Sequence, residues 1–236
     1  MTNLIQIHFN KISDEIIHGF NTFIEKNPLK LECSISINHK TISEIGGRII
    51  EEYTLLALKE LFLKSKDYDF ENLSSKSLGD FILSSTDKDF VKLFFDVKAQ
   101  HISIREKTQT FYLEKGIKQK KPGESHPNLI SYQKAIDFFT DDTKDKEDIC
   151  MLFIKYDPII ENKIVNFNII PLDKNSILLL RNIADKNLSY GNLGKGQIQL
   201  YRLYNIVTIQ RTKLEFVEFI NKLKNQPRKT LSTSKV

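Results

Sequence analysis

Two short apolar segments separated by a polar turn constrain the fold of this chain most strongly. Residues 78–83 (LGDFIL) and 90–99 (FVKLFFDVKA) are largely apolar, and residues 84–89 (SSTDKD) between them are polar. Apolar segments of this length on either side of a short polar turn predict a β-hairpin. The second segment is apolar at consecutive positions, so we expect a strand that is buried on both faces.

Three charged side chains belong to this hairpin. Asp96 and Lys98 are two positions apart on the second strand, so their side chains leave the same face of the sheet. Asp80 lies near the start of the first strand, and the turn brings it beside Asp96. The sequence therefore predicts two carboxylates and an ammonium group at one end of the hairpin.

This combination suits metal-dependent hydrolysis of a phosphodiester, which makes Asp80, Asp96 and Lys98 the candidate catalytic residues. Mg²⁺ prefers oxygen ligands, and Asp80, Asp96 and the backbone carbonyl of Val97 can supply them. Lys98 can orient or deprotonate the attacking water. Alternatively, Asp96 and Lys98 form only an ion pair, worth less than about 1 kcal/mol at an exposed site. Burial of the strand argues against that alternative, because buried ion pairs are costly.

The distribution of charge is compatible with a polyanionic partner. The net charge is +5, and Lys and Arg gather in residues 105–121 and again after residue 222. Such clusters are typical of phosphate binding, although solvated surface segments look the same. An acidic segment is predicted to be a solvated loop: Asp141, Asp142, Asp145, Glu147 and Asp148.

Cysteine usage and hydropathy indicate the compartment. Cys33 and Cys150 are far apart and lack a C-x-x-C spacing, so we expect neither a disulfide framework nor a zinc site. Residues 1–10 lack the pattern of a signal peptide. No apolar segment approaches the roughly 20 residues that a membrane span requires. We therefore expect a cytoplasmic protein without a membrane partner.

Hydrophobic periodicity predicts alternating helices and strands in one domain, residues 1–236, without repeats or a linker. Residues 67–77 are expected to be a polar connection, residues 100–127 a basic insertion near the DNA, and residues 225–236 a loose tail. Strands are expected at residues 31–37, 78–83, 90–99, 149–156, 164–170 and 198–210. Helices are expected at residues 12–25, 49–63, 127–139, 174–184 and 213–223.

Several segments, in the same order, resemble the HincII family of type II restriction endonucleases. Residues 96–103 (DVKAQHIS) are similar to its active-site strand, and residues 127–131 (PNLIS) to the start of a helix that contacts DNA bases. Residues 196–200 (GQIQL) and 211–216 (RTKLEF) resemble its late strand and final helix. Residues 47–61 resemble an early helix that carries a glutamate, here Glu51. The hairpin resembles the PD-(D/E)-x-K nuclease pattern, with Gly79 in place of the usual proline.

The resemblance implies an α/β fold of the restriction-endonuclease type, with a central mixed β-sheet flanked by α-helices. It implies a homodimer that binds double-stranded DNA and, with Mg²⁺, hydrolyses phosphodiester bonds at a short palindromic site. Glu51 would join the catalytic residues. The residues implied to contact DNA are Gln100, His101, Asn128, Ser131, Tyr190 and Asn192.

Other readings of the sequence stay open. A repair, resolvase or transposon-associated nuclease would use the same fold. A non-catalytic DNA-binding module would bind DNA without losing function when Asp96 is changed to Asn. Residues 99–127 form a longer connection than the family has, and could be an added DNA-wrapping hairpin or a dimer element. Residues 191–196 lack the Gly-Lys-Ser/Thr of a phosphate loop and predict a flexible loop. His101 and His126 are expected at the surface or beside the DNA.

Overall fold

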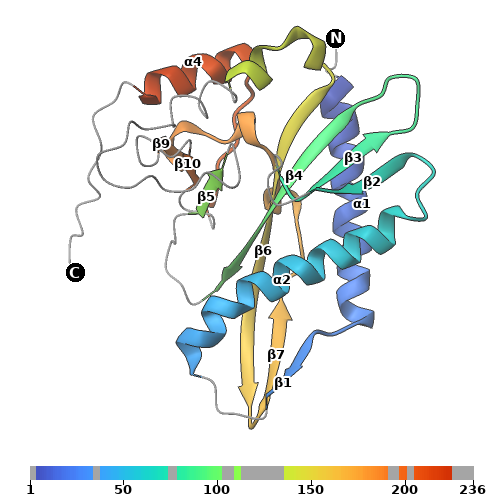
Figure 1. Cartoon of the computed structure of the whole chain (residues 1–236), viewed down its shortest axis with the longest axis vertical. Helices are drawn as coiled ribbons and strands as arrows, with labels where there is room; N and C mark the ends of the chain where they lie inside the picture. The colour runs from blue at the N-terminus through green and yellow to red at the C-terminus, as the bar shows by residue number, and fades with distance from the viewer. Residues whose placement is uncertain are drawn as a thin grey trace.

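The computed structural model describes residues 4–33, 38–73, 79–102, 109–112, 136–190, 197–200 and 205–224. Its helices and strands form two β-sheets with helices packed against them (Figure 1). The helices are α1 (Leu4–Lys26), α2 (His39–Phe62) and α4 (Lys213–Lys224). The strands are β1 (Lys30–Glu32), β2 (Tyr68–Asn72), β3 (Phe81–Ser85), β4 (Lys92–His101), β5 (Gln109–Tyr112), β6 (Glu147–Glu161), β7 (Ile164–Ile169), β8 (Ile177–Leu179), β9 (Leu188–Tyr190) and β10 (Gln197–Leu200).

The larger sheet is mixed. Its strand order is β1-β7-β6-β4-β3-β2, and β8 pairs with β6 beside β7. Strands β4 and β6 run parallel from the pair Lys92↔Glu147 to the pair His101↔Tyr156, and the other pairs are antiparallel. The antiparallel β3–β4 pair confirms the predicted hairpin. A smaller sheet has the order β5-β10-β9. The α/β class with a mixed sheet flanked by helices is therefore confirmed.

Helices α1 and α2 cover one face of the larger sheet (Figure 1). The buried positions of α1 recur at helical spacing and include Ile5, Phe9, Ile12, Ile16 and Phe20. They pack with the odd-numbered residues of β4, such as Phe95 and Val97, in one hydrophobic core. This apolar stripe extends α1 back to Leu4, so the predicted start at residue 12 is wrong.

Helix α2 also begins earlier than predicted. The side chain of Asn38 caps it by accepting a hydrogen bond from the backbone N–H of Thr41 at 2.8 Å. The helix includes Gly46 and Gly47, which lie before the predicted start at residue 49. A Cβ on Gly46 would lie 3.0 Å from the ring of Tyr156, so glycine lets α2 approach β6 closely.

The opposite face of the sheet packs against α4 and a helical segment at residues 136–140. The even-numbered residues of β4 and the odd-numbered residues of β6 lie on this face. The buried residues of this second core include Phe138, Phe139, Ile149, Met151, Phe153, Leu178 and Phe216. The predicted last helix at residues 213–223 agrees with α4.

Two other segments differ from the sequence expectations. Residues 174–184 contain β8 between two short 3₁₀ turns rather than an α-helix. The carboxylate of Asp173 caps the start of the first turn by accepting hydrogen bonds from the N–H groups of Asn175 and Ser176. Residues 68–72 are the edge strand β2, although a polar connection was expected. Its Tyr68 is buried while the following Asp69 is exposed.

The acidic segment is not entirely a solvated loop. Asp148 has no exposed surface, and its carboxylate binds the guanidinium of Arg181 at 2.7 Å. Glu147 begins β6. The expectation fails at these two positions because the strand that follows the loop starts inside the acidic run.

Several expectations concern residues outside the described ranges. These include most of the helix at residues 127–139, most of the basic segment at residues 105–121, and the tail after residue 224. Asn128, Ser131 and Asn192 also lie outside the described residues. Among the helices of the described residues, none is both long and apolar enough to cross a membrane.

Candidate active site

Asp80 stands where β3 begins beside β4. Its backbone N–H donates a hydrogen bond to the carbonyl of Phe95 at 2.7 Å. The preceding Gly79 has φ +85°, and a Cβ there would lie 2.5 Å from the same Phe95 carbonyl oxygen. Proline, fixed near φ −65°, cannot adopt this conformation. The glycine in place of the usual proline is therefore required by the backbone.

The side chain of Asp80 continues the pairing that the backbone of β3 has begun. Its Oδ2 accepts a hydrogen bond from the N–H of Val97 at 2.8 Å. The N–H and C=O groups of a strand residue point to the same side of the strand. The Val97 carbonyl, predicted as a metal ligand, therefore emerges on the side of β4 that Asp80 occupies.

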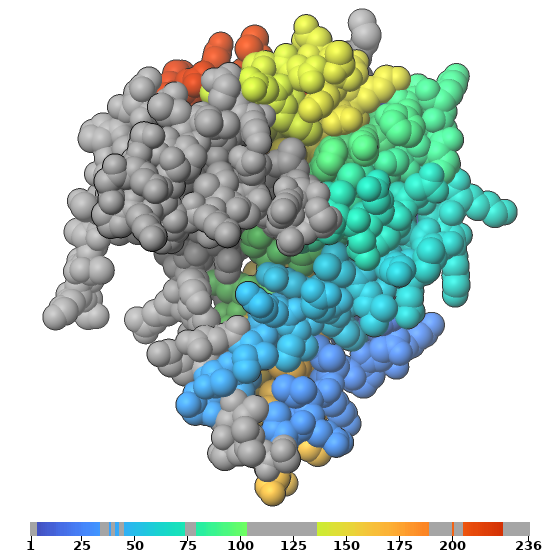
Figure 2. Space-filling model, viewed as in Figure 1, coloured from blue at the N-terminus to red at the C-terminus, as the bar shows by residue number. Residues whose placement is uncertain are grey.

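Glu51 reaches the same edge of β4 from helix α2. Its Oε1 lies 3.5 Å from the N–H of Ala99, a long hydrogen bond. In the space-filling view, green atoms of β4 are visible beside the blue and cyan atoms of α2 (Figure 2). Beyond Phe95, the N–H groups of Val97 and Ala99 thus meet carboxylates where a neighbouring strand would otherwise lie.

Asp96 and Lys98 form a buried ion pair on the adjoining face of β4. The Lys98 ammonium contacts Oδ2 of Asp96, whose side chain is only 1% exposed. Burial alone would lower the pKa of Lys98, but the charges of Asp96, Asp80 and Glu51 outweigh it and raise that pKa above its ordinary value. Lys98 is therefore a charged hydrogen-bond donor at neutral pH.

The protonation of Glu51 is coupled to the same group of residues. Burial raises the pKa of Glu51, and the negative charges of Asp80 and Asp96 act in the same direction. The ammonium of Lys98 and the N–H of Ala99 oppose this shift without cancelling it. The four side chains that the sequence singled out thus lie within electrostatic range of one another.

The donor atoms of this group suit a hard divalent cation. Asp80, Asp96 and Glu51 offer carboxylate oxygens, and Val97 offers a carbonyl oxygen. Mg²⁺ is usually held by one or two carboxylates together with water molecules. The residues present therefore fit Mg²⁺ by donor type, although within the described residues the carboxylate oxygens of Asp80, Asp96 and Glu51 are not gathered within 4.8 Å of one another. Binding through Asp96 would compete with the ammonium of Lys98 for the same carboxylate.

Gln100 follows Asp96 and Lys98 on the same face of β4. Its side chain is 4% exposed, and within the described residues neither amide atom makes a hydrogen bond. An unsatisfied buried amide costs about 1–3 kcal/mol. Such a cost calls for an explanation, and a role in binding is one explanation.

His101 lies on the opposite face from Gln100 and is buried, so the expectation of a surface histidine is wrong. Its ring is 6% exposed and packs edge-to-face on Tyr156, with ring centroids 5.5 Å apart. Strand alternation places this position toward α2.

Tyr156 was not among the predicted site residues. It is 1% exposed, and burial raises its pKa to about 12, with a further contribution from the charge of Glu51. The tyrosine therefore packs beneath both His101 and the part of α2 that carries Glu51. In the sequence it is one more apolar position of a strand, and only the β4–β6 register reveals its place.

A cleft of about 360 Å³ lies further along the same face as Asp96. Its lining includes Phe153 and Lys155, which pair in register with Lys98 and Gln100. Lys186, Asn175 and Ser176 give it a polar wall. The cleft contains none of the predicted catalytic residues, and its volume suits a small group rather than a duplex.

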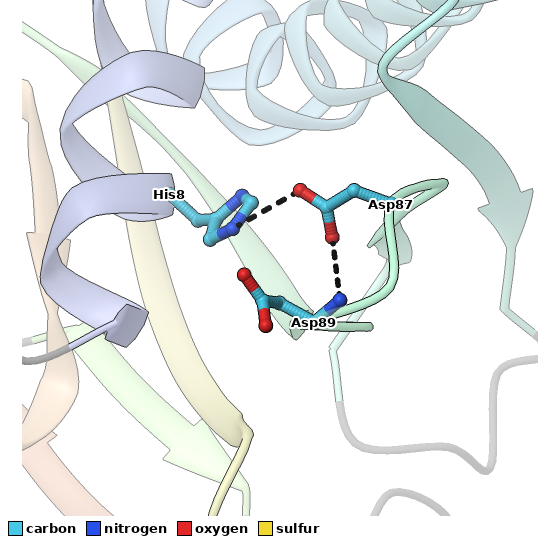
Figure 3. A group of neighbouring side chains, drawn as sticks. All are labelled: His8, Asp87 and Asp89. Carbon is cyan, nitrogen blue, oxygen red and sulfur yellow. Dashed lines mark hydrogen bonds and ion pairs between the residues drawn. The ribbon is translucent and has the colours of Figure 1, made fainter.

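A second group of side chains could hold a metal ion. His8 of α1 faces Asp87 and Asp89 in the turn between β3 and β4, with ligand atoms within 4.8 Å of one another (Figure 3). This group lies at the turn end of the hairpin, away from Asp80 and Asp96. Sequence reasoning assigned these residues no role, because His8 is far from the two aspartates along the chain.

The remaining predicted contact is Tyr190, at the end of β9, whose backbone pairs with Ile198 of β10. Comparison with protein-family models found no match for this chain, and comparison with curated proteins found none either.

Proposed function

We propose that this chain is a Mg²⁺-dependent endonuclease that hydrolyses phosphodiester bonds in double-stranded DNA. The observation that carries the proposal is the capping of β4 by two carboxylates beside a buried Asp–Lys pair. Asp80 and Glu51 occupy the N–H groups of Val97 and Ala99, and Asp96 and Lys98 adjoin them. An ion pair with 1% exposure at Asp96 is costly to keep unless it has a use.

The residues divide the work by their chemistry. Asp80, Asp96 and the Val97 carbonyl would hold the cation, with Glu51 completing the ligands directly or through water. Bound there, Mg²⁺ would neutralise the scissile phosphate and lower the pKa of a coordinated water. The hydrogen bond from Val97 fixes the Asp80 carboxylate, so little reorientation is needed when substrate binds.

Lys98 would orient the attacking water and offset the charge that develops on the phosphate. Its raised pKa keeps it protonated at neutral pH, which favours these roles over that of a general base. With Asp96 engaged by the cation, the ammonium of Lys98 would be available to contact the phosphate.

Within this proposal, we infer a type II restriction endonuclease of the restriction-endonuclease fold that acts as a homodimer on a short palindrome. The net charge of +5 favours association with DNA. The amide of Gln100, on the same face as Asp96 and Lys98, has no hydrogen-bond partner among the described residues, which supports a contact between Gln100 and the substrate. Asn128, Ser131, Tyr190 and Asn192 are the other proposed DNA contacts.

Digestion of plasmid and phage DNA by the purified protein, with and without Mg²⁺, tests the proposal. We expect discrete fragments that require Mg²⁺. Asp96→Asn should reduce the rate roughly 1,000-fold, because a metal ligand is worth several kcal/mol. Asp69→Asn, an exposed acid on β2, is the matched control and should cleave normally.

Other outcomes would decide against the proposal or part of it. Mg²⁺-dependent cleavage without site preference, or only of branched DNA, would favour a repair or resolvase nuclease over a restriction enzyme. If the protein binds DNA but leaves it intact with every metal ion tested, the nuclease proposal is wrong. That result would favour a non-catalytic DNA-binding module.

A further inference from the structure

His8 is a buried imidazole oriented for a contact at its Nε2 atom. The residue is 8% exposed, and its Nδ1 lies 3.1 Å from the hydroxyl of Tyr68. When Nδ1 carries the proton of that hydrogen bond, Nε2 presents a lone pair. Nε2 faces the carboxylate of Asp87, with 3.5 Å between Nε2 and Asp87 Oδ2.

Asp87 is held so that one oxygen faces this imidazole. Its Oδ1 accepts hydrogen bonds from the Ser85 hydroxyl at 3.0 Å and from the N–H groups of Asp89 and Phe90 at 3.0 and 3.3 Å. These bonds fix the carboxylate and leave Oδ2 directed at Nε2. Figure 3 shows the Asp89 carboxylate beside the same ring, so three side chains converge from α1 and the turn.

The separation of these atoms suits a metal. Two ligands at 2.0–2.1 Å from a tetrahedral zinc ion lie about 3.4 Å apart. The observed distance between Nε2 and Asp87 Oδ2 is 3.5 Å, which is long for a hydrogen bond. Asp89 completes a set of three ligand atoms that lie within 4.8 Å of one another, so a small rotation of its half-buried side chain suffices.

The charges around the group favour a cation. An imidazole that binds a metal is neutral, so with the two carboxylates the group would present a charge of −2 to the ion. The nearby ammonium of Lys11 is bound to Asp67 at 2.6 Å and does not contact Asp87 Oδ2. The charges of Glu15, Asp67 and Asp87 contribute to a raised pKa of Tyr68, about 12, for which burial is the larger cause. Three carboxylates thus act on Tyr68, the partner of His8, beside the ammonium of Lys11, which lies 5.6 Å from the centre of the Tyr68 ring.

We propose that His8, Asp87 and Asp89 form a structural site for a transition-metal dication of the zinc class. An imidazole with carboxylates suits zinc or its neighbours, whereas Mg²⁺ prefers oxygen ligands alone. The Tyr68 hydroxyl orients the histidine, as partners of metal-binding histidines commonly do. The ion ties α1 to the turn of the β3–β4 hairpin, at the opposite end from Asp80 and Asp96.

Zinc titration of the EDTA-treated full chain against a chromogenic chelator tests this site. We expect one zinc ion per chain, and a fall in affinity of at least about tenfold in His8→Gln and in Asp89→Asn. Because His8 is buried, Asp89→Asn is the variant that leaves the core intact. Co²⁺ in place of zinc should give the visible absorption of a tetrahedral ion in the unaltered protein and lose it in both variants.

Three controls separate this site from other metal-binding groups. His18→Gln changes an exposed histidine on the same helix, and Asp14→Asn an exposed acid there, so both should bind zinc normally. Asp96→Asn removes a proposed Mg²⁺ ligand and should also leave zinc binding unchanged. Unchanged zinc affinity in both His8→Gln and Asp89→Asn, or no zinc bound by the unaltered protein, would overturn the proposal without bearing on the nuclease.

Discussion

The Oδ2 atom of Asp80 accepts a hydrogen bond from the backbone N–H of Val97 at 2.8 Å. Two residues before Val97 on β4, the carbonyl of Phe95 accepts a hydrogen bond from the backbone N–H of Asp80. Asp80 thus pairs with β4 twice: its backbone bonds to Phe95 beside the start of β3, and its side chain bonds to Val97 past that start. The position of this carboxylate is therefore set by strand pairing, and so is its place beside Asp96.

The Asp96–Lys98 pair should respond to Mg²⁺ in a way that a purely structural pair does not. Lys98→Met removes the ammonium from a buried carboxylate and should cost about 3–5 kcal/mol of unfolding free energy without metal. Mg²⁺ should restore part of this stability, because the cation takes the place of the ammonium. Urea unfolding with EDTA and with Mg²⁺ measures both quantities.

The Asp148–Arg181 pair provides the control for that experiment. It is equally buried, with its atoms 2.7 Å apart, and lies outside the proposed active site. Arg181→Met should also destabilise the fold, but Mg²⁺ should not restore it. If Mg²⁺ restores the stability of both variants equally, or restores it in neither, the proposed cation site at Asp96 is wrong.

The affinity for the metal should fall on acidification. It should begin to fall at a higher pH than it would if Glu51 had the pKa of an ordinary glutamate. Burial raises the pKa of Glu51, so the carboxyl becomes neutral while ordinary glutamates are still ionised. Below that pKa the site loses one negative charge, and Mg²⁺ affinity falls. Mn²⁺ titration at a series of pH values should show this loss. Glu51→Gln should bind the metal about 10–100-fold more weakly and should lack this step.

Glycine at position 79 should be essential for the position of Asp80. Gly79→Ala places a Cβ 2.5 Å from the Phe95 carbonyl oxygen at φ +85°, which costs at least about 1–3 kcal/mol. We expect a lower melting temperature and lower cleavage activity. Gly47→Ala is the matched control, because its Cβ would meet only the Tyr156 hydroxyl at 3.9 Å. Because position 47 lies within α2, Gly47→Ala should raise the unfolding free energy by about 0.5–1 kcal/mol. Equal effects of the two changes would refute the argument.

Replacing Gln100 should raise stability and lower function together. Gln100→Met keeps the volume of the side chain and removes an amide whose two polar atoms are buried without hydrogen bonds to any described residue. Thermal unfolding should shift upward, while the affinity for DNA falls. Calorimetry and a DNA-binding titration measure the two effects. A Gln100→Met protein that is less stable but binds DNA normally would show that the residue has only a packing role.

Local patterns in the sequence predicted the hairpin and the charged residues at its end. Asp96 and Lys98 are two apart on one strand, and a short turn joins them to Asp80, so chain geometry alone brings them together. The contact of Glu51 with Ala99 spans 48 positions along the chain, and only the resemblance to a known family suggested it. The burial of Asp148 could not be foreseen, because its partner Arg181 lies 33 positions away.

Other elements were misread because tertiary contacts outweigh local preference. The apolar residues of Ile177–Leu179 fit a helical pattern, yet they pair with β6 and are buried as a strand. Gly46 and Gly47 resemble a helix break in the sequence, but the close approach of α2 to Tyr156 requires a small residue within the helix. In each case a neighbour distant in sequence decides the conformation.

The carboxylates that occupy the Val97 and Ala99 amides have a consequence for solubility. A strand edge with free N–H groups can recruit a strand from another molecule and so start aggregation. Asp80 and Glu51 block this edge of β4 with negative charge. Shortening either side chain to alanine opens the edge, so such variants should self-associate. Light scattering should therefore accompany any activity assay of these variants, and Asp80→Asn and Glu51→Gln, which keep an acceptor at the edge, should stay monodisperse.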